Sequence, residues 1–295
     1  MNSHQAAGHG GVAIDRGAAI HYIRGRRCPQ GGYSFYRTPE WGVEEPSAPD
    51  TFAALDALRL LGEPAQDAEQ SVAWLQSLQN GNGSWPTLTI ASAADAALAL
   101  LNGTPRHDPS SWLRGQWAHR VKRKSNRAWE GALVGLHQLL QLVQHYLPQL
   151  LVDEGNALSV ILAQARDPSG VWSIDGPDLE STSTALALAN MAHWPLPNVS
   201  SVSDWWHLCE DPILGLRMTP TAGQTTAATL RSGLDIALSL DLHPRHPRAI
   251  ATQLYLMQHP SGGFGARHRA LATLQDTRQA LCAVESLSRL TGDLS

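Results

Sequence analysis

Runs rich in alanine and leucine recur along the chain, and each follows a short polar loop. Six of them begin near Asp50, Ala91, Trp129, Ser181, Thr226 and Asp276. Alanine and leucine are good helix formers, and apolar residues on several faces are expected of helices buried on more than one side. The pattern therefore predicts six buried inner helices, three of which we expect to be capped by Asp50, Ser181 and Asp276.

More amphipathic runs precede these segments. Two examples are "AEQSVAWLQSL" from Ala68 and "HPRAIATQLYLM" from His246. Turns that combine glycine with an aromatic residue follow such runs, in "CPQGGYSF", "QNGNGSW", "QARDPSGVW" and "QHPSGGF". A glutamine stands upstream in three of these turns, at Gln79, Gln164 and Gln258. One unit is thus an outer helix, a Gly-aromatic turn and an inner helix.

The spacing of the turns gives the number of units. The turn aromatics Tyr33, Trp85, Trp172 and Phe264 stand 52, 87 and 92 residues apart. The two longer gaps are nearly twice a unit of about 45 residues, so each is expected to hide a degenerate copy. The candidate copies are the segments that begin at Ser110 and at Val202. The sequence therefore predicts six helix pairs.

Six helix pairs can form an open solenoid or a closed ring. Closure is favoured, because inner helices this apolar would leave an exposed seam at each open end and no polar capping repeat is visible. We therefore predict an all-α protein, a single α/α-toroid domain over residues 1–295 with inner and outer helix layers. The first 17 residues are expected to form a flexible N-terminus.

Composition narrows the class of partner. The chain is 43% hydrophobic and 16% charged with a formal net charge of −4, which is typical of soluble globular proteins and gives no global basic field for nucleic acid. Its three cysteines, an odd number, favour a reducing compartment. Neither a signal-peptide stretch nor a run of about 18 apolar residues is present. We expect a cytoplasmic protein without a transmembrane segment.

The turns "QNGNGSW", "QARDPSGVW" and "QHPSGGF" resemble the QW repeat of squalene and terpene cyclases and of protein prenyltransferase β-subunits. The resemblance covers nearly the whole chain. It implies a barrel whose apolar, aromatic-lined cavity holds an isoprenoid or its diphosphate. It also implies polar chemistry at the mouth of the barrel, where the inner helices begin and their N-termini offer partial positive charge.

The zinc site of the protein prenyltransferases in this family has no match in the chain. Those enzymes hold zinc through Asp and Cys ahead of the fifth inner helix and through His ahead of the sixth. Here Gln224 and Thr226 occupy the first two positions, and Asp276 lies at or beside the third. No other Cys/His spacing suggests zinc. We expect no resident metal or other cofactor, and magnesium would enter together with a diphosphate substrate.

The acid motif of class II terpene cyclases, DxDD, is degenerate in this chain. The segment "PDLESTSTALAL" places Asp178, Leu179, Glu180 and Ser181 at the four positions. The resemblance implies that Glu180 is the catalytic acid and that Asp178 assists it. Protonation of an alkene needs an acid that burial keeps neutral. The alternative is that these residues only cap the fourth inner helix.

A basic loop, residues 114–127, leads to the third inner helix, and no acid occurs from Ser110 to Trp129. Arginine and lysine suit phosphate, and tryptophan faces suit polyenes and carbocations. The candidate substrate-binding residues are accordingly Arg120, Lys122, Arg123, Arg127, Arg217, Arg267, Arg269, Trp129 and Trp41. The alternative for the basic loop is a solvated surface or a patch that docks an acidic protein partner.

Three functions remain open from the sequence. The first is a toroid that binds a hydrophobic isoprenoid, with cyclase-like acid chemistry at Glu180 and Asp178. The second is a non-catalytic toroid that binds a ligand or a protein partner, the partner through the basic loop. The third is a zinc-free protein similar to a prenyltransferase β-subunit.

Overall fold

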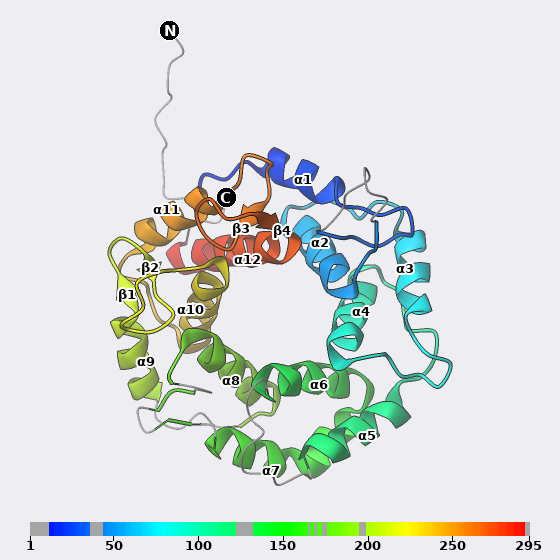
Figure 1. The fold of residues 1–295 in the computed structure, drawn as a ribbon. Helices are drawn as coiled ribbons and strands as arrows, with labels where there is room; N and C mark the ends of the chain where they lie inside the picture. Colours follow the sequence, from blue (N-terminus) through cyan, green and yellow to red (C-terminus); the bar gives the residue numbers. More distant parts are fainter. Residues whose placement is uncertain are drawn as a thin grey trace.

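Twelve helices alternate between an outer and an inner layer in the part of the chain that the structure describes (Figure 1). That structure is a computed structural model, and it describes residues 12–35, 44–121, 132–164, 166–167, 170–172, 176–194 and 199–292. The outer helices are α1 (Arg16–Arg24), α3 (Ala68–Ser77), α5 (Ser110–Val121), α7 (Pro148–Gln164), α9 (Val199–Leu208) and α11 (Pro247–Met257). The inner helices are α2 (Ala48–Leu60), α4 (Leu88–Leu100), α6 (Ala132–Tyr146), α8 (Leu179–Met191), α10 (Ala227–Leu240) and α12 (Leu274–Thr291).

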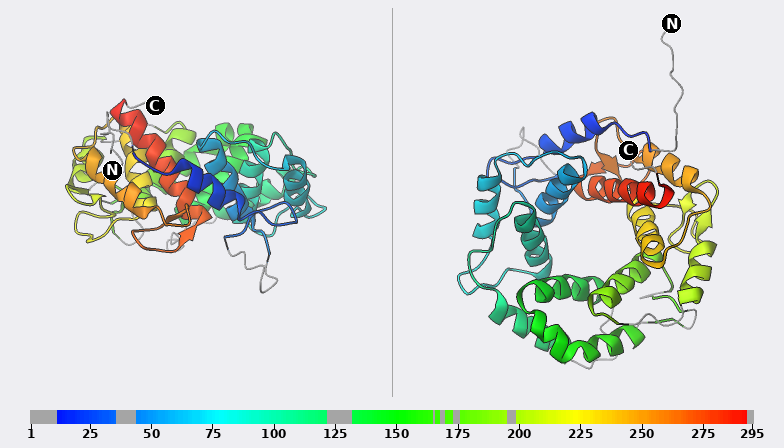
Figure 2. Two further views of the ribbon diagram at one scale, coloured as in Figure 1. Left: turned by 90° about the horizontal axis from the view of Figure 1, so that it is seen from above. Right: turned by 180° about the vertical axis from the view of Figure 1, so that it is seen from behind.

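The inner helices form a closed ring, as predicted. Each contacts the next along the chain, and α12 returns to contact α2 (Figure 2). Two short antiparallel strand pairs lie ahead of the last two inner helices: β1 (Glu210–Asp211) with β2 (Gly215–Leu216), and β3 (Phe264–Gly265) with β4 (Ala272–Thr273). The all-α toroid of six helix pairs is confirmed, including the two degenerate units that begin at Ser110 and Val202.

Small side chains allow the inner helices to be buried on several sides. Ala53, Ala54 and Ala57 of α2 are fully buried, although they point in different directions around the helix. Alanine lets neighbouring helix axes approach closely while the adjacent leucines fill the space between the layers. The apolar runs of the sequence are therefore the core of the ring.

Three of the inner helices, α2, α8 and α12, begin three residues earlier than the sequence suggested. The true N-caps of the three helices in question are Ser47, Asp178 and Thr273. The expected caps Asp50, Ser181 and Asp276 lie in the first turn, where their backbone N–H groups donate to the cap side chains at 2.7–3.1 Å. Those three expectations were wrong because a short polar side chain is favourable both at the cap and in the first turn.

The glutamine of the Gly-aromatic turn joins one unit to the next. Gln79 donates from Nε2 to the carbonyl of Gly83 (3.0 Å) in its own turn and to the carbonyl of His107 (2.8 Å). Its Oε1 accepts the N–H of His107 at 2.8 Å. Since His107 lies just ahead of α5, the side chain fixes the start of the next outer helix.

The last unit repeats this arrangement on the first residues of the chain. Gln258 donates to the carbonyls of Gly262 (3.0 Å) and Asp15 (2.8 Å), and it accepts the N–H of Asp15 at 2.8 Å. Asp15 is the N-cap of α1, so α1 follows α11 in the outer layer. The flexible N-terminus expected to reach residue 17 therefore does not include residues 12–17.

The third turn replaces glutamine by arginine. Arg166 stands six residues before Trp172, as Gln258 stands six before Phe264, and Nε of Arg166 donates to the carbonyl of Gly170 at 2.8 Å. Gln164, the residue expected from the sequence, is the last residue of α7. The position needs a side-chain N–H donor, and arginine supplies one as well as glutamine does.

Buried threonines of the inner helices hold the turn aromatics. The N–H of Tyr33, Trp172 and Phe264 donates to Oγ1 of Thr51 (2.9 Å), Thr182 (3.3 Å) and Thr277 (2.9 Å). Each threonine is the fourth residue of its helix and is fully buried, as are the three aromatic residues. The aromatic residue of the turn is thus part of the joint between helices.

Candidate functional site

A cavity of about 1040 Å³ lies inside the ring, between residues of α6, α8, α10 and α12. That volume is at the upper end of the range for small-molecule sites. Its apolar lining consists of Leu133, Val134, Ala187 and Ala228. Apart from Gly176, the other described lining residues are polar or charged, and none is Phe, Tyr or Trp. The described wall therefore departs from the apolar, aromatic-lined cavity that the resemblance implied.

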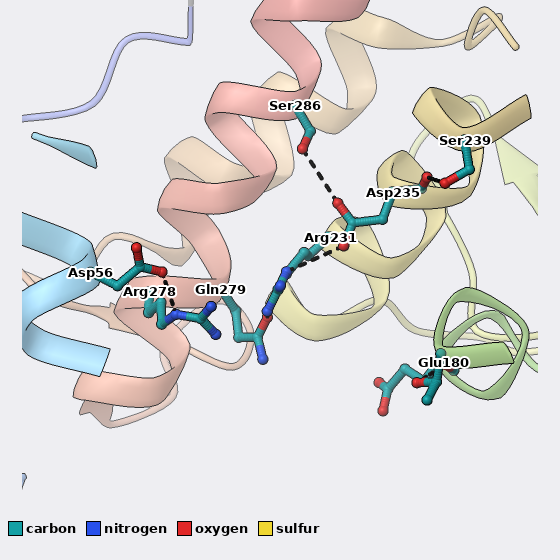
Figure 3. A network of polar contacts seen from close by, with 9 residues as sticks. Asp56, Glu180, Arg231, Asp235, Ser239, Arg278, Gln279 and Ser286 are labelled. Atoms are coloured by element: carbon teal, nitrogen blue, oxygen red, sulfur yellow. Dashed lines mark hydrogen bonds and ion pairs between the residues drawn. The ribbon is translucent and has the colours of Figure 1, made fainter. Parts of the chain in front are cut away.

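Glu180 is the second residue of α8 and lines this cavity. Its carboxylate accepts no hydrogen bond from any other described residue, and in Figure 3 it stands apart from the dashed contacts of Arg231, Asp235 and Arg278. Burial raises the pKa of Glu180, and the nearby charge of Asp178 raises it further. A half-buried acid with a raised pKa holds its proton at higher pH, as a general acid must.

Asp178 lines the same cavity but is already engaged in the helix. Its Oδ1 accepts the backbone N–H of Ser181 at 2.7 Å, which caps α8. Ser181, at the position of the last Asp in DxDD, also lines the cavity. The structure thus brings together the residues singled out in "PDLES", with Asp178 as the cap and Glu180 directed to the cavity.

The wall on α10 and α12 carries a polar network that was not predicted from the sequence (Figure 3). Arg231 lies 3.3 Å from Asp235 (Nε to Oδ2) and donates from Nη1 to Oε1 of Gln279 at 2.8 Å. Oγ of Ser286 donates to Asp235 at 3.5 Å. Burial raises the pKa of Asp235, an effect that the charge of Arg231 opposes. The available signal was an Arg and an Asp four residues apart within an apolar run.

Polar pairs also join α4 to α6. Ser92 donates to Gln141 at 3.3 Å, and Asp95 lies 3.2 Å from Nδ1 of His145. The residues in these pairs are 49 and 50 positions apart, close to one unit of the repeat. Equivalent positions of successive inner helices therefore face each other. Among the described residues, no side chain of α8 bonds to α6 or α10, so the α8 wall is free to meet a ligand.

The positions where the family's zinc ligands would stand have other partners. Gln224 accepts a hydrogen bond from Arg267 at 3.0 Å, and Thr226 is the N-cap of α10. Asp276 accepts from Oγ1 of Thr273 at 2.7 Å. Within the described ranges, no group of three or more His, Cys, Asp or Glu side chains is placed to hold a metal ion.

The described arginines among the candidate substrate-binding residues do not line the central cavity. Arg217 donates to the carbonyl of Leu208 at 3.2 Å, and Arg267 and Arg269 are exposed in the segment before β4. Arg120 is exposed at the end of α5, with its guanidinium against Gly135. Residues 114–121, expected as part of a loop, belong to α5. The remaining candidates lie outside the described residues, as do residues 122–127 of the basic loop: Lys122, Arg123, Arg127, Trp129 and Trp41.

The family model of the prenyltransferase alpha-alpha toroid domain matches residues 10–100 and 163–294. No curated protein matches the chain. No helix in the described part of the chain is long and apolar enough to cross a membrane.

Two solved structures share the fold. Protein geranylgeranyltransferase-I from Candida albicans, solved in complex with GGPP, aligns with a TM-score of 0.61 and 13% identity over 83% of this chain and 85% of that one. The type II terpene cyclase MstE from Scytonema, in its apo form, aligns with a TM-score of 0.58 and 12% identity over 95% and 97%. At these identities the likeness establishes the fold alone.

Proposed function

The chain belongs to the prenyltransferase alpha-alpha toroid domain family, and on that premise we propose that it binds an isoprenoid in its central cavity, where Glu180 acts as a general acid. One observation carries the proposal. Glu180 is half-buried in the wall of a ligand-sized cavity, has no side-chain partner among the described residues, and has a raised pKa. The solved relatives, one in complex with GGPP and one a type II terpene cyclase, support the choice of ligand.

The acid step follows from the position of Glu180. Its carboxyl group transfers a proton to one carbon of an alkene, and the alkene electron pair forms the new C–H bond. The resulting carbocation is attacked by the next double bond of the same chain, which closes a ring. Loss of a proton to water ends the reaction, and Glu180 is reprotonated from solvent. The role of Asp178 is to raise the pKa of Glu180 while it caps α8.

A specific observation favours a second candidate, a toroid that binds without turnover. Carbocations are stabilised by aromatic faces, and the described lining has no Phe, Tyr or Trp. Such a protein would hold its ligand in the same cavity and would not need a proton from Glu180. Recruitment of an acidic protein by the basic loop belongs to this candidate, and so does the interpretation as a zinc-free protein similar to a prenyltransferase β-subunit.

Glu180→Gln distinguishes the two candidates. The matched control is Glu69→Gln, because Glu69 is also the second residue of its helix but is exposed on outer helix α3. Polyene substrates of 15 and 20 carbons are incubated with each protein, products are identified by mass spectrometry, and binding is measured by calorimetry. The acid role predicts binding by all three proteins and a loss of turnover of roughly 100-fold or more in Glu180→Gln alone. Binding without turnover in the wild type supports the second candidate, and absence of binding contradicts both.

A further inference from the structure

The described wall of the central cavity is acidic overall. It carries the carboxyl groups of Asp178, Glu180 and Asp235 and a single permanent cation, Arg231. The remaining titratable side chain there, His137, has a pKa lowered by burial and by the charge of Arg231, so it is neutral at pH 7. A diphosphate group brought into this space would meet more negative than positive charge.

Arg231, the one arginine of the described lining, and two further arginines of the inner helices already have acidic partners. Arg231 is held by Asp235 and by Gln279. Arg278 and Arg59 both contact the carboxylate of Asp56, at 2.6 and 2.8 Å. A diphosphate is bound by several cations whose donors are not engaged elsewhere. These contacts leave no such cluster among the cavity-lining residues that the structure describes.

Uncharged hydrogen-bonding groups remain open to the cavity. Ser183 of α8 and Ser232 of α10 line it, and neither hydroxyl has a partner among the described residues. They lie on helices that also supply Ala187 and Ala228 to the apolar lining. The cavity therefore offers an apolar surface beside hydroxyl groups, which suits a hydrocarbon chain that ends in an alcohol.

We infer that the isoprenoid taken by the central cavity is a neutral alcohol rather than a diphosphate, with its hydroxyl group bound by Ser183 and Ser232. This inference rests on the proposed function, because it names the substrate class of the same site. An alcohol can donate to and accept from a serine hydroxyl at no electrostatic cost. It also brings no negative charge close to the carboxyl group of Glu180.

Three probes with one hydrocarbon chain test the inference: farnesol, farnesyl diphosphate and the hydrocarbon farnesene. Calorimetric binding is measured below the aggregation limit of each, and the diphosphate is tested with and without Mg²⁺. Farnesol is expected to bind at least tenfold more tightly than the other two. The double variant Ser183→Ala/Ser232→Ala is expected to lower farnesol affinity to that of farnesene. Glu180→Gln is expected to improve the diphosphate affinity several-fold, and Glu69→Gln is expected to change nothing.

The outcomes separate this inference from the function on which it rests. If farnesyl diphosphate or farnesene binds as tightly as farnesol, the neutral-alcohol inference is overturned while isoprenoid binding stands. If farnesol keeps its preference in the double serine variant, the assignment of the hydroxyl site is overturned. If none of the three probes binds, the proposed function fails, and the inference fails with it.

Discussion

Arg278 and Asp56 are 222 residues apart in the sequence, and Nε of Arg278 donates to Oδ2 of Asp56 at 2.6 Å. The two side chains are only 15% and 8% exposed. The guanidinium of Arg278 also lies over the ring of Phe52, 4.5 Å from its centroid. Because Asp56 and Phe52 belong to α2 and Arg278 to α12, these contacts lie at the seam where the ring closes.

Loss of the seam contact is expected to destabilise the whole ring. In Arg278→Met, Asp56 loses its shielded partner, which is expected to lower the free energy of unfolding by about 3 kcal/mol. The control is Arg59→Met, which removes the other, 53% exposed, partner of Asp56 and is expected to cost less than about 1 kcal/mol. Urea unfolding measures both. If the two variants lower the free energy of unfolding equally, the contact between Arg278 and Asp56 stabilises the ring no more than the exposed contact of Arg59 does.

Removal of the Gln258 side chain is expected to release α1. Gln258→Ala deletes the two hydrogen bonds to Asp15 and the one to Gly262, and a cost of about 2 kcal/mol is expected. Hydrogen exchange should quicken in α1 more than in the other outer helices. Gln253→Ala is the control, because Gln253 lies on α11, the helix that Gln258 caps, and donates to the carbonyl of Ile213 instead. Unchanged protection of α1 would contradict this role.

Because the pKa of Glu180 is raised, the effect of substituting it on stability is expected to depend on pH. The folded state binds this proton more tightly than the unfolded chain, in which the pKa is near its ordinary value of 4.5. Stability therefore falls as pH rises from that value through the folded pKa, and the loss persists above it. Glu180→Gln removes this loss, so its melting temperature relative to the wild type should be about 1–3 °C higher at pH 7 than at pH 4. If the melting-temperature difference between Glu180→Gln and the wild type is the same at both pH values, the pKa of Glu180 is not raised by folding.

The architecture was predictable because it repeats. Runs of helix formers and Gly-aromatic turns recur with a near-constant period, and two clear copies constrain the interpretation of a degenerate one. The residue at an individual position was harder to predict where two residue types can make the same hydrogen bond. Arg166 replaces glutamine as the hydrogen-bond donor in the third turn. Because a glutamine was expected at this position, Gln164 was assigned to it instead.

The candidate site was only partly predictable. Glu180 could be singled out because an acid remains at the third position of a known motif, although two of the motif's three Asp residues are replaced, by Glu180 and Ser181. Arg231 and Asp235 were missed because their helix was interpreted as an apolar run, although a spacing of four residues places both on one face. The contact of Arg231 with Gln279 depends on the register between successive inner helices, and a unit of about 45 residues does not fix that register to the single residue.

Closure of the ring also bears on how the protein folds. An open solenoid can fray from its ends, one repeat at a time, because its terminal repeats have one neighbour. Here α12 contacts α2, so every inner helix has two neighbours and loosening any unit exposes two faces. The contact between Asp56 and Arg278 also carries a large loop-closure entropy and is expected to form late in folding. The ring should accordingly unfold as one cooperative unit, with no end at which unravelling can begin.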